Sequence, residues 1–111
     1  MLTIESLKAF GANTDEGVAR CVNNEAFYIR MVGKAVVDPN FDKLSTSVAS
    51  GDLDAAFEAA HALKGILGNL SLTPVLEPVK TITELLRSKE NADYASLVNE
   101  IIEKKNALAA L

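Results

Sequence analysis

The sequence predicts an all-α protein, an up-down-up-down four-helix bundle with additional short N-terminal helices. Helical spacing of apolar residues recurs along nearly the whole chain, and no strand-like alternation persists. Short connections join the last four long helical patterns, as is typical of antiparallel neighbours in a bundle. With 111 residues and 49% hydrophobic composition, the chain is long enough to bury one core. We therefore expect a single domain over residues 1–111.

The first three helical patterns are short. A helical start covers residues 3–10, and a second brief helix is expected over 15–23. Residues 24–37 then place apolar side chains at helical spacing. The Asp-Pro-Asn run at 38–40 interrupts the chain and separates this pattern from the next one.

The next boundary is marked by capping residues. Phe41, Leu44 and Val48 lie on one face of a helix, which Gly51 ends in the usual C-terminal position. Asp52 is a suitable N-cap for the helix that follows it. The chain therefore changes direction between these two helices at residues 51–52.

Two further helices complete the predicted bundle. Thr73 and Pro74 begin a helix that extends to about Ser88. Pro78 lies in the first turns of this helix, where it is expected to kink them or to delay the start. The last helix is expected over residues 93–108.

His61, the only histidine of the chain, lies on the helix expected over residues 52–71. At about 100° per residue, the apolar stripe of this helix is buried and His61 points away from it toward solvent. Gly65 and Gly68 follow on the histidine face, where each costs about 1 kcal/mol relative to Ala. Without a Cβ there, another protein can approach the backbone and reach the imidazole. The predicted stripe consists of Leu53, Ala56, Phe57, Ala60, Leu63, Leu67 and Leu70.

A lone histidine binds little metal and builds no catalytic triad, but it can carry a phosphoryl group on a ring nitrogen. Lys64, three residues after His61, flanks the same site. Its flexible side chain can bring an ammonium group beside phosphoryl oxygens. The residues around the histidine therefore favour phosphoryl chemistry.

The run from His61 through Leu63-Lys64-Gly65 to Gly68-Asn69-Leu70 resembles the signature of a known family. That family is the histidine-containing phosphotransfer (HPt) domains of two-component phosphorelays. Its pattern is a histidine with Leu-Lys-Gly at the second to fourth positions after it, then a small residue, Asn or Ser, an aliphatic residue and usually Gly. Ser71 stands where the final Gly is common. Residues 11–20 and the Gly-Asp-Leu entry to the helix also look like the family.

The resemblance implies that His61 accepts a phosphoryl group from an aspartyl phosphate of one receiver domain, by attack through its ε nitrogen. The group then passes to the aspartate of another receiver. Lys64 would offset phosphoryl charge, and Gly65, Gly68 and Asn69 would face the docked partner. The expected partners are receiver domains of response regulators and of a hybrid sensor kinase.

The resemblance also implies a phosphoryl carrier that is a substrate of its partners and not an enzyme. We expect no cofactor or metal on this chain, with Mg²⁺ on the partner receiver domain. We expect the protein to be a monomer.

Each of these residues also has a purely structural interpretation. Lys64 would then be a solvated charge, and Asn69 a polar surface residue. Gly65 and Gly68 would permit close packing against an earlier short helix. Glu58 either orients the imidazole through its other ring nitrogen or is solvated, and we favour solvation.

Other functions compete with phosphotransfer. Glu58 and His61 have the Glu-x-x-His spacing of di-iron bundles, but such sites need that motif on two helices and two further glutamates. A histidine kinase would need an ATP-binding domain, for which 111 residues leave no room. The alternative kept open is a non-catalytic helical adaptor that binds and inhibits a receiver or a kinase, with its histidine unused.

Charge and composition restrict the classes of molecule that this protein is expected to bind. The formal net charge is −4 with both signs interspersed, so no basic stripe indicates nucleic acid. No apolar run approaches the ~20 residues of a membrane span, and no signal-peptide pattern precedes Thr3. With Cys21 as the only cysteine, we expect a cytoplasmic protein that binds neither nucleic acid nor membrane. Met1 and the end soon after the last helix favour a free-standing protein over a segment of a hybrid kinase.

Overall fold

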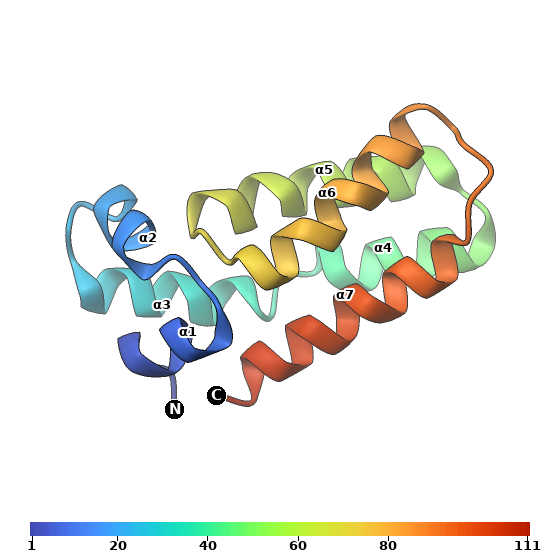
Figure 1. Ribbon diagram of the computed structural model, residues 1–111. Coiled ribbons are helices and arrows are strands. Elements are labelled where there is room, and N and C mark those ends of the chain that lie inside the picture. Colours follow the sequence, from blue (N-terminus) through green and yellow to red (C-terminus); the bar gives the residue numbers. More distant parts are fainter.

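Seven α-helices and no strand make up the protein, whose computed structural model describes all 111 residues (Figure 1). The all-α class predicted from the sequence is confirmed. None of the helices combines the length and the apolar character that a membrane crossing requires. The helices are α1 (Ile4–Phe10), α2 (Thr14–Arg20), α3 (Glu25–Ala35), α4 (Asn40–Ser50), α5 (Leu53–Asn69), α6 (Thr73–Arg87) and α7 (Tyr94–Ala109).

Helices α4 to α7 form a bundle in which α5 packs against α4 and α6, and α7 also packs against α4 and α6. Successive helices of the bundle run in opposite directions (Figure 1). α3 leads into α4 nearly end to end, and α1 and α2 fold beside α3 at one end of the molecule. The two chain termini lie close together, where the Met1 amine donates a hydrogen bond to the Leu111 carbonyl.

One continuous hydrophobic core extends from α1 to α7. Leu63 and Leu67 of α5 are buried in it, together with Ile82 of α6 and Ile101 of α7. Burying a side chain of this size stabilises the fold by about 1.5–3 kcal/mol relative to exposing it. These leucines therefore hold one side of α5 against the bundle and fix which side of the helix faces outward.

Caps define both ends of α5. Gly51 ends α4 with a left-handed backbone (φ 78°), and the Asp52 side chain accepts a hydrogen bond from the Ala55 N–H at 3.1 Å. Both caps agree with the sequence prediction. The helix ends at Asn69, two residues before the predicted position, because Ser71 adopts a left-handed backbone (φ 53°) that no helix continues through.

Two predicted helix ends in the N-terminal part are wrong. α2 ends at Arg20 and not at residue 23, because Val22 and Asn23 both have left-handed backbones (φ 51° and 57°). α3 ends at Ala35 and not at residue 37. Left-handed residues that are not glycine leave little trace in a sequence, so periodicity overestimated the length of α2.

Of the two effects expected of Pro78, a kink in the first turns or a delayed start of the helix, the delayed start is wrong. α6 begins at Thr73 and continues unbroken through Pro78 to Arg87. Proline has no N–H, so the helix loses one hydrogen bond, the one that the Pro74 carbonyl would have accepted. Pro78 is buried in the bundle, where packing stabilises the helix.

Candidate functional site

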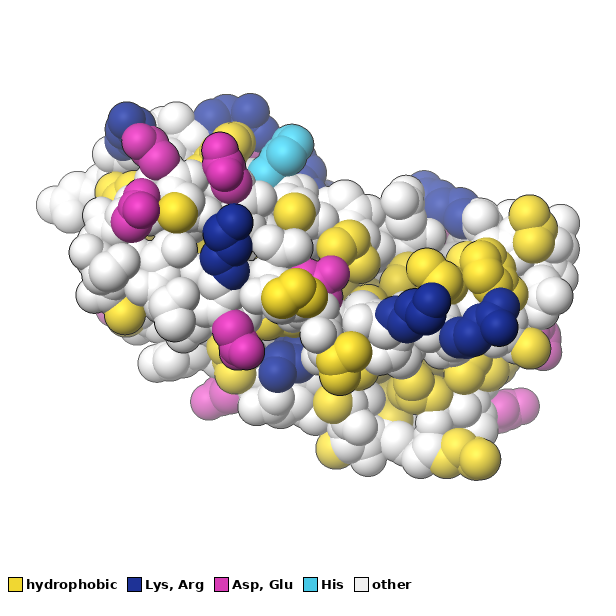
Figure 2. All heavy atoms as spheres, turned by 180° about the vertical axis from the view of Figure 1, so that it is seen from behind, with side chains coloured by type: hydrophobic (Ala, Val, Ile, Leu, Met, Phe, Trp, Pro, Cys, Tyr) yellow, Lys and Arg dark blue, Asp and Glu magenta, His cyan; other side chains and the backbone are white.

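His61 lies on the outward face of α5, where its side chain is exposed (Figure 2, cyan). The opposite face of the same helix carries the buried Ala56, Ala60 and Leu63, as the sequence predicts. Ala59 is also buried, although the predicted stripe omitted it. The solvent-facing position predicted for the histidine is therefore confirmed.

The imidazole of His61 stacks on the ring of Phe57, one turn earlier in α5. The ring centroids are 5.7 Å apart and the planes are inclined by 18°, within the range of offset stacking. The sequence predicts Phe57 in the buried stripe, but in the structure this side chain is only partly buried. Leu53 is likewise only partly buried. The spacing of four residues between Phe57 and His61 was the available signal, since such pairs are neighbours on a helix.

Two residues of α6 contact neighbours of the histidine on α5, and the sequence did not reveal either of them. The Arg87 guanidinium lies over the Phe57 ring, 5.2 Å from its centroid. Its Nε also donates a hydrogen bond to Glu84 Oε2 at 3.3 Å. Glu84 Oε1 in turn lies 3.9 Å from Lys64 Nζ. Lys64 is therefore in an ion pair that bridges α5 and α6, and is not a solitary surface charge.

The glycines on the histidine face border open space. A Cβ built on Gly65 or Gly68 would meet no atom within 4 Å. The alternative that these glycines permit close packing against an earlier helix is thereby excluded. Gly17 of α2 is the contrast, because its Cβ would lie 2.4 Å from Tyr28 Cε1 and 2.8 Å from the Leu70 carbonyl oxygen.

A cleft of about 610 Å³ opens beside the C-terminal part of α5. Its lining from α5 includes Ile66 and Asn69, and the facing wall includes Phe27 and Met31 of α3. Figure 2 shows hydrophobic side chains with basic ones among them at the α2–α3 end of the molecule, in the same view as the histidine. Asn69, expected to contact a partner, is exposed at the edge of this cleft. The basic residues of the lining are Arg20 and Lys34.

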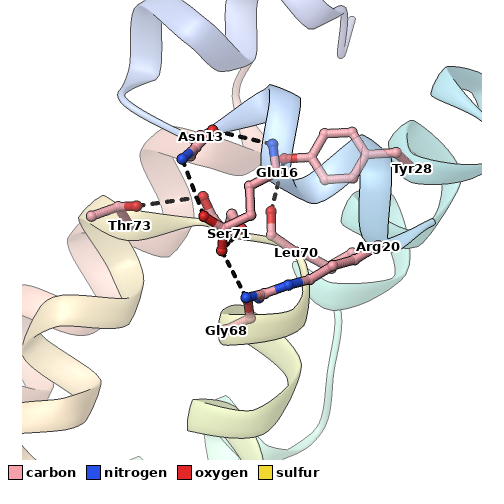
Figure 3. A network of polar contacts seen from close by, with 8 residues as sticks. All are labelled: Asn13, Glu16, Arg20, Tyr28, Gly68, Leu70, Ser71 and Thr73. Carbon is pink, nitrogen blue, oxygen red and sulfur yellow. Dashed lines mark hydrogen bonds and ion pairs between the residues drawn. The ribbon is translucent and has the colours of Figure 1, made fainter. Parts of the chain in front are cut away.

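A polar network ties the end of α5 to α2 (Figure 3). The Ser71 hydroxyl donates a hydrogen bond to Glu16 Oε1 at 3.1 Å, and Glu16 forms an ion pair with Arg20 at 2.8 Å. Arg20 also donates a hydrogen bond to the Gly68 carbonyl. The Asn13 N–H donates to the Ser71 carbonyl at 3.0 Å. The Gly68 carbonyl of α5 and the Ser71 carbonyl beyond its end thus both accept hydrogen bonds from α2 or its N-cap residue.

Tyr28 secures the same helix end from α3. The Tyr28 side chain is fully buried, and its hydroxyl donates a hydrogen bond to the Leu70 carbonyl at 2.8 Å. Burial raises the pKa of Tyr28 to about 12, and nearby Cys21 acts in the same direction. The phenol therefore remains a hydrogen-bond donor throughout the neutral pH range.

Glu58 is exposed, and no hydrogen bond joins it to the imidazole, in agreement with the solvated state favoured above. His61 and Glu58 belong to no group of three or more metal-ligating side chains. The geometry that a di-iron site requires is therefore not built around these two residues.

Comparison with known proteins gives one family. The model of the Hpt domain matches residues 35–111, which include the last residue of α3 and all of α4 to α7. α1, α2 and most of α3 lie outside the match. No curated protein and no solved structure matches the chain.

Proposed function

The chain belongs to the Hpt domain family, and on this premise we propose that His61 is the residue that carries the phosphoryl group. Hpt domains take part in phosphotransfer in two-component relays, with receiver domains as partners, and they are phosphocarriers, not catalysts. His61 is the only histidine of the chain, it lies within the matched residues and it is exposed. Its exposure on a helix whose other side is buried is the observation that carries the proposal.

The proposed reaction is a reversible transfer between receiver domains. The lone pair of the His61 ε nitrogen attacks the phosphorus of an aspartyl phosphate, an N–P bond forms and the P–O bond to the aspartate breaks. The carboxylate of the first receiver leaves with the electron pair. An aspartate oxygen of a second receiver then attacks the same phosphorus, and His61 leaves as neutral imidazole. Mg²⁺ bound by the receiver would stabilise the charge on the transferred group.

Lys64 and the glycine face have separate roles in this proposal. Lys64 offsets the negative charge of the phosphoryl group on the carrier side. Gly65 and Gly68 allow the receiver to approach the α5 backbone, which is supported by the open space beside both residues. Asn69 contacts the docked receiver, and the neighbouring cleft accommodates apolar side chains of that partner.

Label transfer tests the proposal directly. The full chain is incubated with a panel of receiver domains that carry ³²P-labelled aspartyl phosphate. We expect the wild type to take the label in a form that is lost in acid and retained in base, as a phosphoramidate is. The variant His61→Gln should take none and should keep the same helical circular dichroism.

Two results would contradict the proposal. Label on the His61→Gln variant would place the phosphoryl group on another residue. Binding of a receiver without any label on the wild type would support the inhibitory adaptor that the sequence leaves as the alternative.

A further inference from the structure

Glu84 of α6 is the carboxylate that two cations near the histidine share. One oxygen lies 3.9 Å from Lys64 Nζ, and the other accepts the hydrogen bond from Arg87 Nε at 3.3 Å. Arg87 lies over the Phe57 ring on which His61 stacks. His61 thus contacts Phe57, which in turn contacts Arg87. Glu84 then links Arg87 to Lys64.

We infer that Glu84 is a positioning residue. It holds Lys64 and Arg87 while His61 is unmodified. After transfer, it competes with the phosphoryl group for these two cations. The inference rests on the proposed function. Glu84 forms and breaks no covalent bond in it. Its effect is on the free energy of the phosphorylated state relative to the unmodified state.

Charge gives the direction of the effect. A phosphoryl group adds close to two negative charges and three acceptor oxygens beside His61. Lys64 lies three residues away on the same helix, so its side chain can turn from Glu84 to that group. Its ion pair with Glu84 is long, and the two side chains are 37% and 60% exposed, so it is weak enough to open. Because Glu84 retains part of the attraction of both cations, it destabilises the phosphorylated state.

This effect suits a carrier that must release what it accepts. If both cations interacted only with the phosphoryl group, they would lower the free energy of the phosphohistidine and hinder the second transfer. A carboxylate that also attracts these cations favours release of the phosphoryl group. Glu84 therefore sets how the phosphoryl group is distributed between the carrier and the receiver.

The neighbouring carboxylates do not have this arrangement. Asp54 forms an ion pair at 3.5 Å with Lys89, and Lys89 lies beyond the end of α6. Glu77 pairs with Lys80 at 3.8 Å within α6, and its side chain is 61% exposed. Glu77 thus matches Glu84 in helix, exposure and kind of ion pair but has no link to α5, which makes Glu77→Gln the control for Glu84→Gln.

The experiment measures the lifetime of the phosphohistidine on the full chain without any receiver. Phosphoramidate, a small chemical donor, phosphorylates the histidine of the wild type, of Glu84→Gln and of Glu77→Gln, with ammonia as the leaving group. The loss of ³¹P signal from the phosphorylated protein is then followed at fixed pH and ionic strength. A second measurement gives the equilibrium with one phosphorylated receiver domain.

We expect Glu84→Gln to lengthen the lifetime and to shift the equilibrium toward phosphohistidine by about two- to fivefold, the size of one exposed ion pair. Glu77→Gln should behave as the wild type. In a Lys64→Ala/Arg87→Ala background, Glu84→Gln should have no further effect, because the cations for which Glu84 competes are absent.

Three outcomes would overturn the inference. They are an unchanged lifetime in Glu84→Gln, an equal change in Glu77→Gln, and a full effect that persists in the Lys64→Ala/Arg87→Ala background. Failure of the proposed function gives a different result. Receivers would then transfer no label, while the chemically phosphorylated histidine would still have the expected difference in lifetime between the wild type and Glu84→Gln. The two ideas are thus tested separately.

Discussion

Ser71 donates a hydrogen bond to Glu16 across 55 positions of sequence, and it does so from a left-handed backbone with a φ of 53°. Gly adopts such a backbone angle without the steric strain that the Cβ of Ser71 brings. Here the hydrogen bond from the Ser71 hydroxyl to Glu16 offsets the steric strain that a side chain brings to this backbone conformation. The end of α5 is therefore held by a contact that Gly cannot make.

The first prediction follows from this contact. Ser71→Ala keeps the strain and loses the hydrogen bond, so we expect the free energy of unfolding to fall by about 1 kcal/mol. Ser71→Gly loses the same bond but also the strain, so it should unfold at a higher urea concentration than Ser71→Ala. Urea titrations of both variants measure the difference in unfolding free energy, provided that its dependence on urea concentration has the same slope in both. Equal midpoints would show that the backbone at this position carries no strain.

A second prediction concerns the charge of Lys64. Lys64→Ala should slow phosphoryl transfer or shorten the lifetime of the phosphohistidine, because the ammonium group no longer offsets phosphoryl charge. Its free energy of unfolding should change by less than about 1 kcal/mol, since the ion pair with Glu84 is exposed. Lys80→Ala, which breaks a similar pair with Glu77, is the control and should transfer normally. Normal transfer by Lys64→Ala would return this lysine to an ordinary surface role.

The third prediction separates docking from folding at the glycines. Gly65→Gln should keep or raise the melting temperature, because the site is open and Gly is a poor helix former. Transfer should slow by roughly tenfold or more, since a longer side chain holds the receiver off and even ~1 Å of displacement is costly. Gly68→Gln should act in the same direction but less severely. Gly33→Gln in α3, where the nearest atom to a Cβ is 4.0 Å away, is the matched control.

Gly17→Ala should show the opposite behaviour. The added Cβ would overlap the Tyr28 ring and the Leu70 carbonyl, so the chain must shift, and we expect a loss of about 1–3 kcal/mol in unfolding free energy. Thermal unfolding of Gly17→Ala beside Gly65→Ala tests both signs. If both variants gain stability, the packing of Gly17 against Tyr28 and the Leu70 carbonyl is looser in solution than in the structure.

A fifth prediction concerns alkaline pH. Burial raises the pKa of Tyr28 from 10.0 to about 12, so the folded state holds this proton more tightly than the unfolded chain does. The stability that this difference contributes is fully present below about pH 10 and is lost as the pH rises through about 12. The unfolding free energy of the wild type should therefore fall over this range. Tyr28→Phe should lack that part of the decline and should start lower, having lost the bond to the Leu70 carbonyl.

Tyr94 provides the comparison for that experiment. Its hydroxyl also donates to backbone carbonyls, of Leu85 and Glu90, and Tyr94 is 9% exposed whereas Tyr28 is fully buried. Tyr94→Phe therefore serves as the control for the loss of a tyrosine hydroxyl that is bonded to backbone carbonyls. An identical pH profile for wild type and Tyr28→Phe would mean that the Tyr28 phenol is not what loses the proton on unfolding.

The sequence predicts the helices well because apolar periodicity and burial have the same physical origin. Leu63 and Leu67 repeat at the spacing that buries one side of α5, and Asp52 supplies a cap that local chemistry makes recognisable. Local patterns fail where the backbone turns left-handed without glycine, as at Val22 and Ser71. Helix ends there are decided by contacts between distant segments.

The candidate site divides in the same way. The motif places His61, Lys64 and Gly65 on one helix face, and spacing alone is enough for that. Glu84 and Arg87 join the site only because α6 packs against α5 in one particular register. A register between two helices depends on the whole interface, so no residue near the histidine signals which side chains of α6 will reach it.

The stack of His61 on Phe57 provides a natural spectroscopic probe. A ring current from Phe57 should shift the resonances of the two carbon-bound imidazole protons away from those of free histidine. The chain has no second histidine and no tryptophan, so in D2O, where the amide protons have exchanged, these two signals overlap with few others in a proton NMR spectrum. Arrival of a group on the ring, or the approach of a binding partner, would displace them. The unlabelled protein thus offers a continuous readout at the atom group where chemistry is proposed.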